Sequence, residues 1–196
     1  MALTRIAPPL LEPIDLADMR AHLRITSVDA EVDTYISDCI AAAVGMLDAE
    51  GELGLCLIDQ DWAETFASGP RDGRDLCLSL GPVSAIVSVE YRDAAGDWVT
   101  APPADFALYT NGETGGQFVR SAAWPPLAPF PDALKVTYRA GMSPTPAGVP
   151  APLRHALKIL AAHFFEIREA VVIGTVASAI PISVDRLIAP YRIYLK

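Results

Sequence analysis

Cysteine is scarce in this chain of 196 residues, and the three that occur, Cys39, Cys56 and Cys77, form neither a C-x-x-C pair nor an even set. This pattern argues against a disulfide framework and favours small buried side chains in a reducing compartment. The sequence also has no apolar run as long as a membrane span, and its first residues, M-A-L-T-R-I-A-P-P, lack the apolar core of a signal peptide. We therefore expect a soluble protein, made in the cytoplasm, without membrane contact.

Basic residues are also few, with 15 Lys and Arg against 24 Asp and Glu and a net charge of −9. Residues 1–60 carry 3 basic and 11 acidic groups, residues 61–142 carry 6 and 10, and residues 143–196 carry 6 and 3. Binding of DNA through its phosphates needs clustered Lys and Arg, so this balance argues against it. An acidic surface is compatible with DNA that slides past without sticking, although acidity for solubility is more common.

The motifs of several catalytic and metal-binding classes are missing. There is no H-E-x-x-H, no G-x-S-x-G and no EF-hand order, and the Gly-rich T-N-G-E-T-G-G lacks the Lys-Ser/Thr of a P-loop. Two weaker patterns are a metal site at His155, His163 and Glu166, and a calcium site at acids that flank a glycine turn. Those acids are Asp59, Asp61, Asp72 and Asp75. Neither pattern is a complete ligand set, so we expect no catalytic residues, no metal and no cofactor.

The spacing of apolar residues changes along the chain, from helical at both ends to strand-like in the middle. Helical spacing predicts a short helix in I-D-L-A-D-M-R-A-H-L-R-I, capped by Asp15, and a longer one from about Asp29 to about Ala49. Across residues 58–142, alternating or short apolar runs between Gly- and Pro-rich turns predict about five to seven strands. A third helix, with Pro152 in its first turn, has one apolar face. That face consists of Leu153, Ala156, Leu157, Leu160, Phe164 and Ile167.

These patterns predict an α+β fold, a three-helix bundle with an inserted antiparallel β unit and an extended C-terminal tail. Residues 1–57 are expected to supply the N-terminal helices of the bundle, and residues 58–142 the inserted β unit. Residues 143–196 are expected to supply the last bundle helix and the tail.

The tail, S-V-D-R-L-I-A-P-Y-R-I-Y-L-K, contains residue types that are enriched at binding hot spots, among them Tyr191, Arg192 and Tyr194. An extended segment of this kind can add a strand to a partner's sheet or enter a partner's groove. The alternative is a tail that packs against its own domain.

Three groups of stretches together resemble one known family. At the front stand E-P-I-D-L-A-D-M-R-A-H-L-R-I and D-x-x-I-x-x-x-I-x-A, the latter from Asp33 to Ala42. The middle has L-G-P-V-S-A-I-V-S-V-E-Y and V-T-Y-R-A-G, and the end has V-P-A-P-L-R-H-A-L-K-I-L-A-A-H-F-F-E-I-R-E and L-I-A-P-Y-R. In order, spacing and position they resemble the head–tail connector (adaptor) proteins of long-tailed double-stranded DNA phages and of phage-derived gene transfer agents. The resemblance covers nearly the whole chain.

The resemblance implies a structural adaptor without catalytic activity. Such a protein forms a homo-oligomeric ring, commonly of twelve copies, under the portal protein and joins the DNA-filled head to a downstream tail-completion or stopper protein. It is expected in the host cytoplasm during assembly and then at the head–tail joint of the virion or gene transfer agent particle.

The resemblance further implies that the terminal segment contacts the portal. The contact residues we predict are Leu187, Pro190, Tyr191, Arg192, Ile193, Tyr194 and Leu195. Double-stranded DNA is expected to pass through the lumen without specific binding, because an acidic wall repels phosphates. As a hypothesis, Glu31 and Asp38 on the long N-terminal helix line that lumen.

Two other function classes stay open on the sequence. A free-standing cytoplasmic protein that binds a small ligand or peptide through its β unit predicts a monomer or dimer with a concave apolar pocket. A hydrolase-type enzyme needs a convergent acid, base and nucleophile, which the sequence does not bring together.

Overall fold

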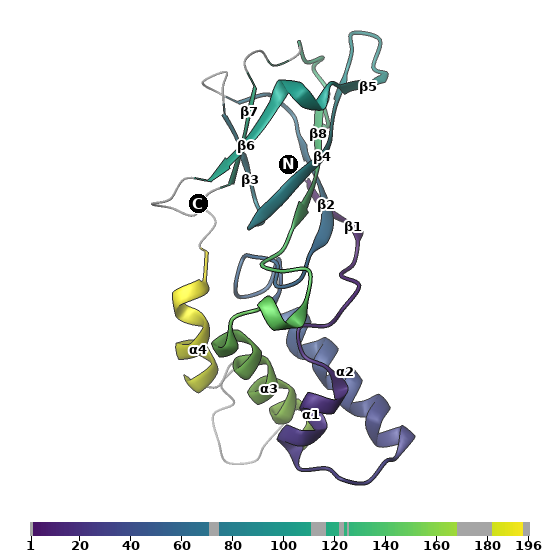
Figure 1. Cartoon of the computed structure of the whole chain (residues 1–196). Helices are drawn as coiled ribbons and strands as arrows, with labels where there is room; N and C mark the ends of the chain where they lie inside the picture. Colours follow the sequence, from purple (N-terminus) through teal and green to yellow (C-terminus); the bar gives the residue numbers. More distant parts are fainter. Residues whose placement is uncertain are drawn as a thin grey trace, which may run out of the picture.

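The computed structural model describes residues 2–70, 75–110, 117–121, 124, 126–167 and 182–193. Along these residues one strand comes first, two helices and seven strands follow, and two helices come last (Figure 1). The helices are α1 (Leu16–Leu23), α2 (Ala30–Leu47), α3 (Ala151–Glu166) and α4 (Ile182–Ile188). The strands are β1 (Ala2–Ala7), β2 (Gln60–Phe66), β3 (Asp75–Leu78), β4 (Val83–Arg92), β5 (Trp98–Ala101), β6 (Phe106–Thr110), β7 (Gln117–Ser121) and β8 (Leu134–Ala140).

The first two helices begin where the sequence predicts, because an aspartate caps each of them. A carboxylate oxygen of Asp15 accepts the N–H of Asp18 at 2.6 Å, and one of Asp29 accepts the N–H of Glu31 at 2.9 Å. These bonds satisfy N–H groups that the first helical turn leaves without a partner. Helical spacing predicts an apolar stripe on this helix at Val32, Ile36, Cys39, Ile40, Ala43 and Leu47. All of these except the half-buried Val32 are buried in α2.

The C-terminal end of the predicted helical bundle differs from the expectation. The third predicted helix is α3, with proline in its first turn. The prediction of an extended tail is corrected, because residues 182–188 form α4 and residues 189–191 form a 3₁₀ turn. Val184 and Ile188 lie one helical turn apart and are fully buried, which stabilises this short helix against α3. Four helices, instead of three, therefore contribute to the described helical part.

The described strands form two antiparallel sheets. A five-stranded sheet has the order β1-β2-β8-β4-β5, and a three-stranded sheet has the order β3-β7-β6. Seven of these strands fall in the predicted β unit. The eighth, β1, pairs with β2 and lies in residues 1–57, which were expected to supply helices of the bundle.

Each part has its own hydrophobic core, and Figure 1 shows the sheets at one end of an elongated molecule and the helices at the other. The helical core is built by α1 to α4 and the segment after α2. The β core lies between the two sheets, and its largest fully buried side chains are Trp62, Leu80, Leu134 and Tyr138.

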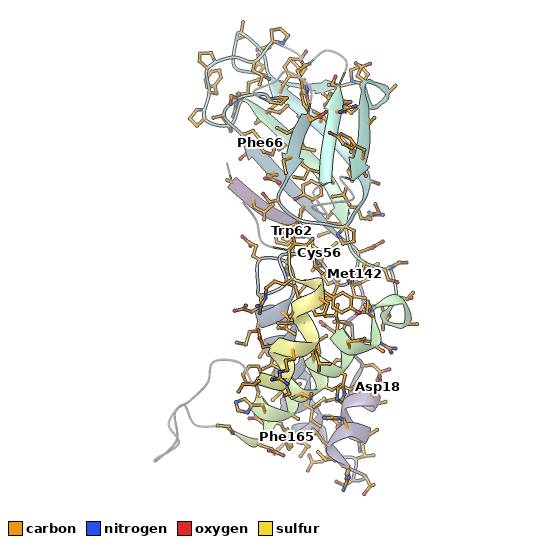
Figure 2. The ribbon with its side chains drawn as sticks, turned by 90° about the vertical axis from the view of Figure 1, so that its left-hand side faces the viewer. Asp18, Cys56, Trp62, Phe66, Met142 and Phe165 are labelled. Carbon is orange, nitrogen blue, oxygen red and sulfur yellow. The ribbon has the colours of Figure 1, made fainter. Side chains whose placement is uncertain are left out.

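The two parts are joined by hydrogen bonds around Cys56 and Met142, which Figure 2 places at the waist of the molecule. The N–H of Met142 donates to the carbonyl of Cys56 at 3.0 Å, and the N–H of Cys56 donates to the carbonyl of Gly81 at 2.8 Å. The buried carboxylate of Asp48, at the end of α2, accepts the N–H of Leu57 and the side-chain amide of Gln60. Burial raises the pKa of Asp48, and these hydrogen bonds oppose that rise.

Candidate interface at the C-terminal segment

We call residues 182–193 the C-terminal segment, since the sequence places the candidate partner contacts there. Its helix α4 packs beside α3 (Figure 1). A 3₁₀ turn follows at residues 189–191, in which Pro190 is exposed. Leu187, Tyr191 and Ile193 are half-buried against the helical core. The segment therefore lies on its own helical part as far as Ile193.

Arg192 fixes the end of this segment. Its guanidinium donates to the carbonyl and the carboxylate of Glu52, each at 3.0 Å, and to the carboxylate of Asp185 at 3.1 Å. The arginine side chain is 16 % exposed, whereas Glu52 and Asp185 are about half exposed. Ion pairs of this kind contribute at most about 1 kcal/mol each, so they orient the segment more than they stabilise the fold.

The backbone of the segment contacts the turn after α2 closely. The N–H of Ile193 donates to the carbonyl of Leu53 at 2.8 Å. Gly54 has φ +65°, and a Cβ there would lie 2.5 Å from the carbonyl oxygen of Ile193. Only glycine satisfies both the left-handed backbone and this approach. Beside this contact lies an open pocket of about 440 Å³, lined by Met46, Glu50, Glu52, Gly54, Arg192 and Ile193 among others.

The predicted portal contacts thus differ in how accessible they are to a partner. Pro190 is exposed, while Arg192 is paired within its own chain. Leu187 also lines a second open pocket, of about 520 Å³, between α3 and α4. Tyr194 and Leu195 lie outside the described residues. Contact of this set with a portal protein stays a prediction.

The predicted lumen acids are exposed on α2. Glu31 and Asp38 are seven residues apart, which is about two helical turns, so they share one side of the helix. Their neighbour Asp33 instead pairs with Arg20 of α1 at 3.2 Å. The position of Glu31 and Asp38 in a lumen stays a prediction.

The weaker metal patterns do not come together in the described residues. His155 lies edge-on to His22 of α1, with ring centroids 6.2 Å apart, and His163 contacts Phe164. Asp61 is bound by Arg139, and Asp72 lies outside the described residues. Asp75 is held by both Arg120 and the hydroxyl of Tyr109. Among the residues described, no group of three or more His, Cys, Asp or Glu side chains is arranged to hold a metal ion.

Glu64 is a fully buried carboxylate in the β core that was not predicted as a site residue. It accepts hydrogen bonds from the N–H and hydroxyl of Ser79, at 2.9 and 2.5 Å, and from the hydroxyl of Tyr138 at 3.2 Å. Burial raises the pKa of Glu64, and the bonds from Ser79 oppose that rise. Alternation along β2 was a usable signal, because it puts Glu64 on the same face as the buried Trp62.

A second unpredicted cluster surrounds Arg92 at the end of β4. The guanidinium holds both carboxylate oxygens of Asp132, at 2.6 and 3.0 Å, and lies 4.4 Å from the ring centroid of Trp98 and 5.4 Å from that of Phe130. The ammonium group of Lys135 lies 4.9 Å from the ring centroid of Trp98 and pairs with the carboxylate of Glu90. The pairing with Asp132 raises the pKa of Arg92.

None of the helices in the described ranges combines the length and the apolar character needed to cross a lipid bilayer.

No family model and no curated protein matches the chain, but solved structures do. A chain from the neck of an empty gene transfer agent particle, computed with C6 symmetry, is similar with a TM-score of 0.74 and 22 % identity. A chain from the virion of a native gene transfer agent particle gives 0.73 and 22 %, and one from the neck of a native particle, computed with C12 symmetry, gives 0.72 and 23 %. Each similarity covers 100 % of this chain and 97 % of the other. The chain therefore shares its complete fold with proteins of gene transfer agent particles.

Proposed function

We propose that this chain is a structural component of the neck of a phage-like or gene transfer agent particle. In this role it is a head–tail adaptor that forms a ring under the portal and joins the DNA-filled head to the tail. The observation that carries the proposal is the similarity of fold, at TM-scores of 0.72 to 0.74, over all of this chain and nearly all of the neck and virion chains. The sequence resemblance to head–tail connectors points in the same direction.

A ring is supported by the symmetry of the related particles, since two of the similar chains come from necks computed with C6 and C12 symmetry. Cyclic symmetry places identical subunits in head-to-tail contact around a closed ring. We propose twelve copies, with double-stranded DNA passing through the lumen and the acids Glu31 and Asp38 facing it. The adaptor acts through binding alone and needs no cofactor.

The portal contact is proposed for the C-terminal segment and the residues that follow it. Pro190 is exposed, and Tyr191 and Ile193 are half-buried, so part of each apolar side chain is accessible to a partner. The buried anchors of the segment, Val184 and Ile188, come earlier in the chain. Residues after Ala189 can therefore be removed while the anchors of α4 are kept.

The test is the mass of the purified protein, alone and with portal rings, by light scattering after size exclusion. We expect a ring-sized species, either alone or only with portal. Deletion of residues after Ala189 is expected to leave a folded protein with helical circular dichroism, while binding to portal is lost. Thermal stability is expected to fall, because Tyr191 and Ile193 no longer pack against the helical core. Substitution Ser183→Ala, at an exposed position of α4, is the control and is expected to bind as the wild type does. A wild-type monomer that ignores portal contradicts the proposal.

The alternative of a ligand pocket inside the β unit is not favoured by the packing. The space between the two sheets is occupied by large side chains, among them Trp62, Leu134 and Tyr138. Both pockets described above lie on the helical part.

A further inference from the structure

The five-stranded sheet has two edge strands, β1 and β5, and each pairs with one other strand. The register across the sheet aligns Ala2 of β1 with Thr100 of β5 through Thr65, Lys135 and Glu90. Along the same sheet Arg5 is level with Ile86, through Trp62 and Tyr138, whereas Trp98 is level with Arg92. The two edges are therefore offset along the strands, and a contact between them needs the strands to be inclined to the axis of a ring. Exposed edges are normally blunted by charges or prolines, or are covered by another segment. The β1 sequence A-L-T-R-I-A has one charge and no proline.

The first of these edges carries exposed apolar side chains, and we call Arg5, Ile6, Leu10 and Leu11 the N-terminal edge. Ile6 is 58 %, Leu10 97 % and Leu11 48 % exposed, which is unusual for three large apolar residues so close in sequence. Arg5 is exposed, and its guanidinium lies 4.9 Å from the ring centroid of Trp62. It forms no ion pair with any described residue.

The opposite edge carries exposed aromatic side chains, and we call Asp97, Trp98 and Phe130 the β5 corner. Trp98 and Phe130 are 38 % and 37 % exposed, and Arg92 lies against both rings. Arg92 also donates to the carbonyl of Gly96 at 2.7 Å, so both aromatic rings rest on a side chain that is itself held in place. Asp97 is exposed and forms no ion pair with any described residue.

We propose that neighbouring copies of this chain join through these two surfaces, the β5 corner of one copy against the N-terminal edge of the next. The inference rests on the ring of the proposed function and names the contact that closes it. A head-to-tail contact needs two unlike surfaces on one subunit, and these two lie on opposite edges of one sheet. Each is apolar, and each carries one exposed charge without an ion pair among the described residues. The positive one is Arg5, which also acts on the buried Asp48, and the negative one is Asp97, which acts on Arg92.

The residue types in the two surfaces indicate how much a substitution weakens the contact between copies. A preorganised tryptophan beside an arginine is typical of interface hot spots, because little conformational entropy is lost when it is buried. Removing such a residue is expected to weaken binding roughly thirtyfold. The other side of the contact offers leucine and isoleucine, which a planar ring can cover.

The first experiment measures self-association by light scattering over a concentration series, with portal rings added in a parallel series. We expect Trp98→Ala and Leu10→Ala each to reduce ring formation strongly, the former roughly thirtyfold. Val28→Ala, which truncates an exposed apolar residue away from both surfaces, is the matched control and is expected to change nothing. Circular dichroism of each variant separates loss of contact from loss of fold.

The second experiment exchanges the two charges. Arg5→Asp and Asp97→Arg are each expected to weaken ring formation, and the double variant is expected to restore it, since the opposite charges then face each other again. Rings that form equally well in every variant overturn the edge contact and leave the proposed function intact. A wild-type chain that stays monomeric at every concentration, with and without portal, overturns both.

Discussion

The helical part and the β part of this molecule bury their cores in different ways. The helical core consists of apolar side chains that recur every three or four residues, so that they lie on one face of each helix. The β core encloses a carboxylate, Glu64, whose partners Ser79 and Tyr138 come from 15 and 74 residues further along the chain. A core built on local spacing can be read from the sequence, whereas a core built on distant polar partners depends on the complete topology.

The largest expected effect on stability comes from opening a cavity in each core in turn. Trp62→Ala in the β core is expected to cost about 3–5 kcal/mol and Leu157→Ala in the helical core about 2–5 kcal/mol. The three tryptophans, Trp62, Trp98 and Trp124, all belong to the β part, so fluorescence reports on it while circular dichroism at 222 nm reports mainly on the helices.

We expect the two signals to change together during urea unfolding of the wild type and of both variants, because the hydrogen bonds around Asp48 and Cys56 join the parts. Two separate transitions in the wild type would show that the parts unfold independently.

The second prediction concerns the pH dependence of stability that the buried carboxylate of Glu64 causes. Burial raises the pKa of Glu64 above the ordinary value of about 4.3, so between the two values the folded state binds more protons than the unfolded state. The free energy of unfolding contributed by Glu64 therefore falls as pH rises from about 4.3 through the folded-state pKa.

The test compares Glu64→Gln with the wild type by urea unfolding at several pH values. We expect the stability of the wild type relative to the variant to decrease with rising pH, by about 1.4 kcal/mol per pH unit within that interval. Tyr138→Phe keeps the carboxyl group and is expected to keep this pH dependence while losing one hydrogen bond. A difference that is flat across pH contradicts a raised pKa.

How much could be predicted from the sequence follows the same division. The caps Asp15 and Asp29 and the apolar stripes of α2 and α3 are local signals, and the helices begin close to the predicted positions. The position of the β unit also follows from local turn residues. By contrast, β1 has only six residues and pairs with a strand more than fifty residues away.

The C-terminal segment shows the same limit. The seven residues of α4 are too few to form a helix alone, and they do so because Val184 and Ile188 bury against α3. The arginine in P-Y-R was predicted to meet a partner, and its intramolecular partners Glu52 and Asp185 are visible only in the fold. Trp98 and Phe130 come together because a turn and a proline-rich loop approach each other in the fold. Apolar periodicity along the sequence carries no signal of that approach.

The third prediction compares two glycines of the helical part. Gly54→Ala places a Cβ at φ +65° and against the Ile193 carbonyl, so it is expected to destabilise by about 1–2 kcal/mol from the backbone alone and to displace the C-terminal segment. Gly45→Ala, in the last turn of α2 with open space around it, is expected to stabilise by at most about 0.5–1 kcal/mol. Thermal unfolding measures both changes, and equal signs for the two variants would contradict the assignment of Gly54 to a close backbone contact.

The smallest expected effect concerns Arg192, and it separates local anchoring from global stability. Arg192→Ala removes the ion pairs to Glu52 and Asp185, which are partly exposed, so global stability is expected to fall by at most about 1 kcal/mol. Hydrogen exchange at the Ile193 amide is expected to accelerate clearly, because its bond to the Leu53 carbonyl depends on the position that Arg192 holds. Arg186→Ala, which removes an exposed arginine of the same segment, is the matched control and is expected to leave that exchange unchanged. If both variants exchange alike, the apolar contacts of Tyr191 and Ile193 suffice to hold the segment, and Arg192 is available to a partner at no conformational cost.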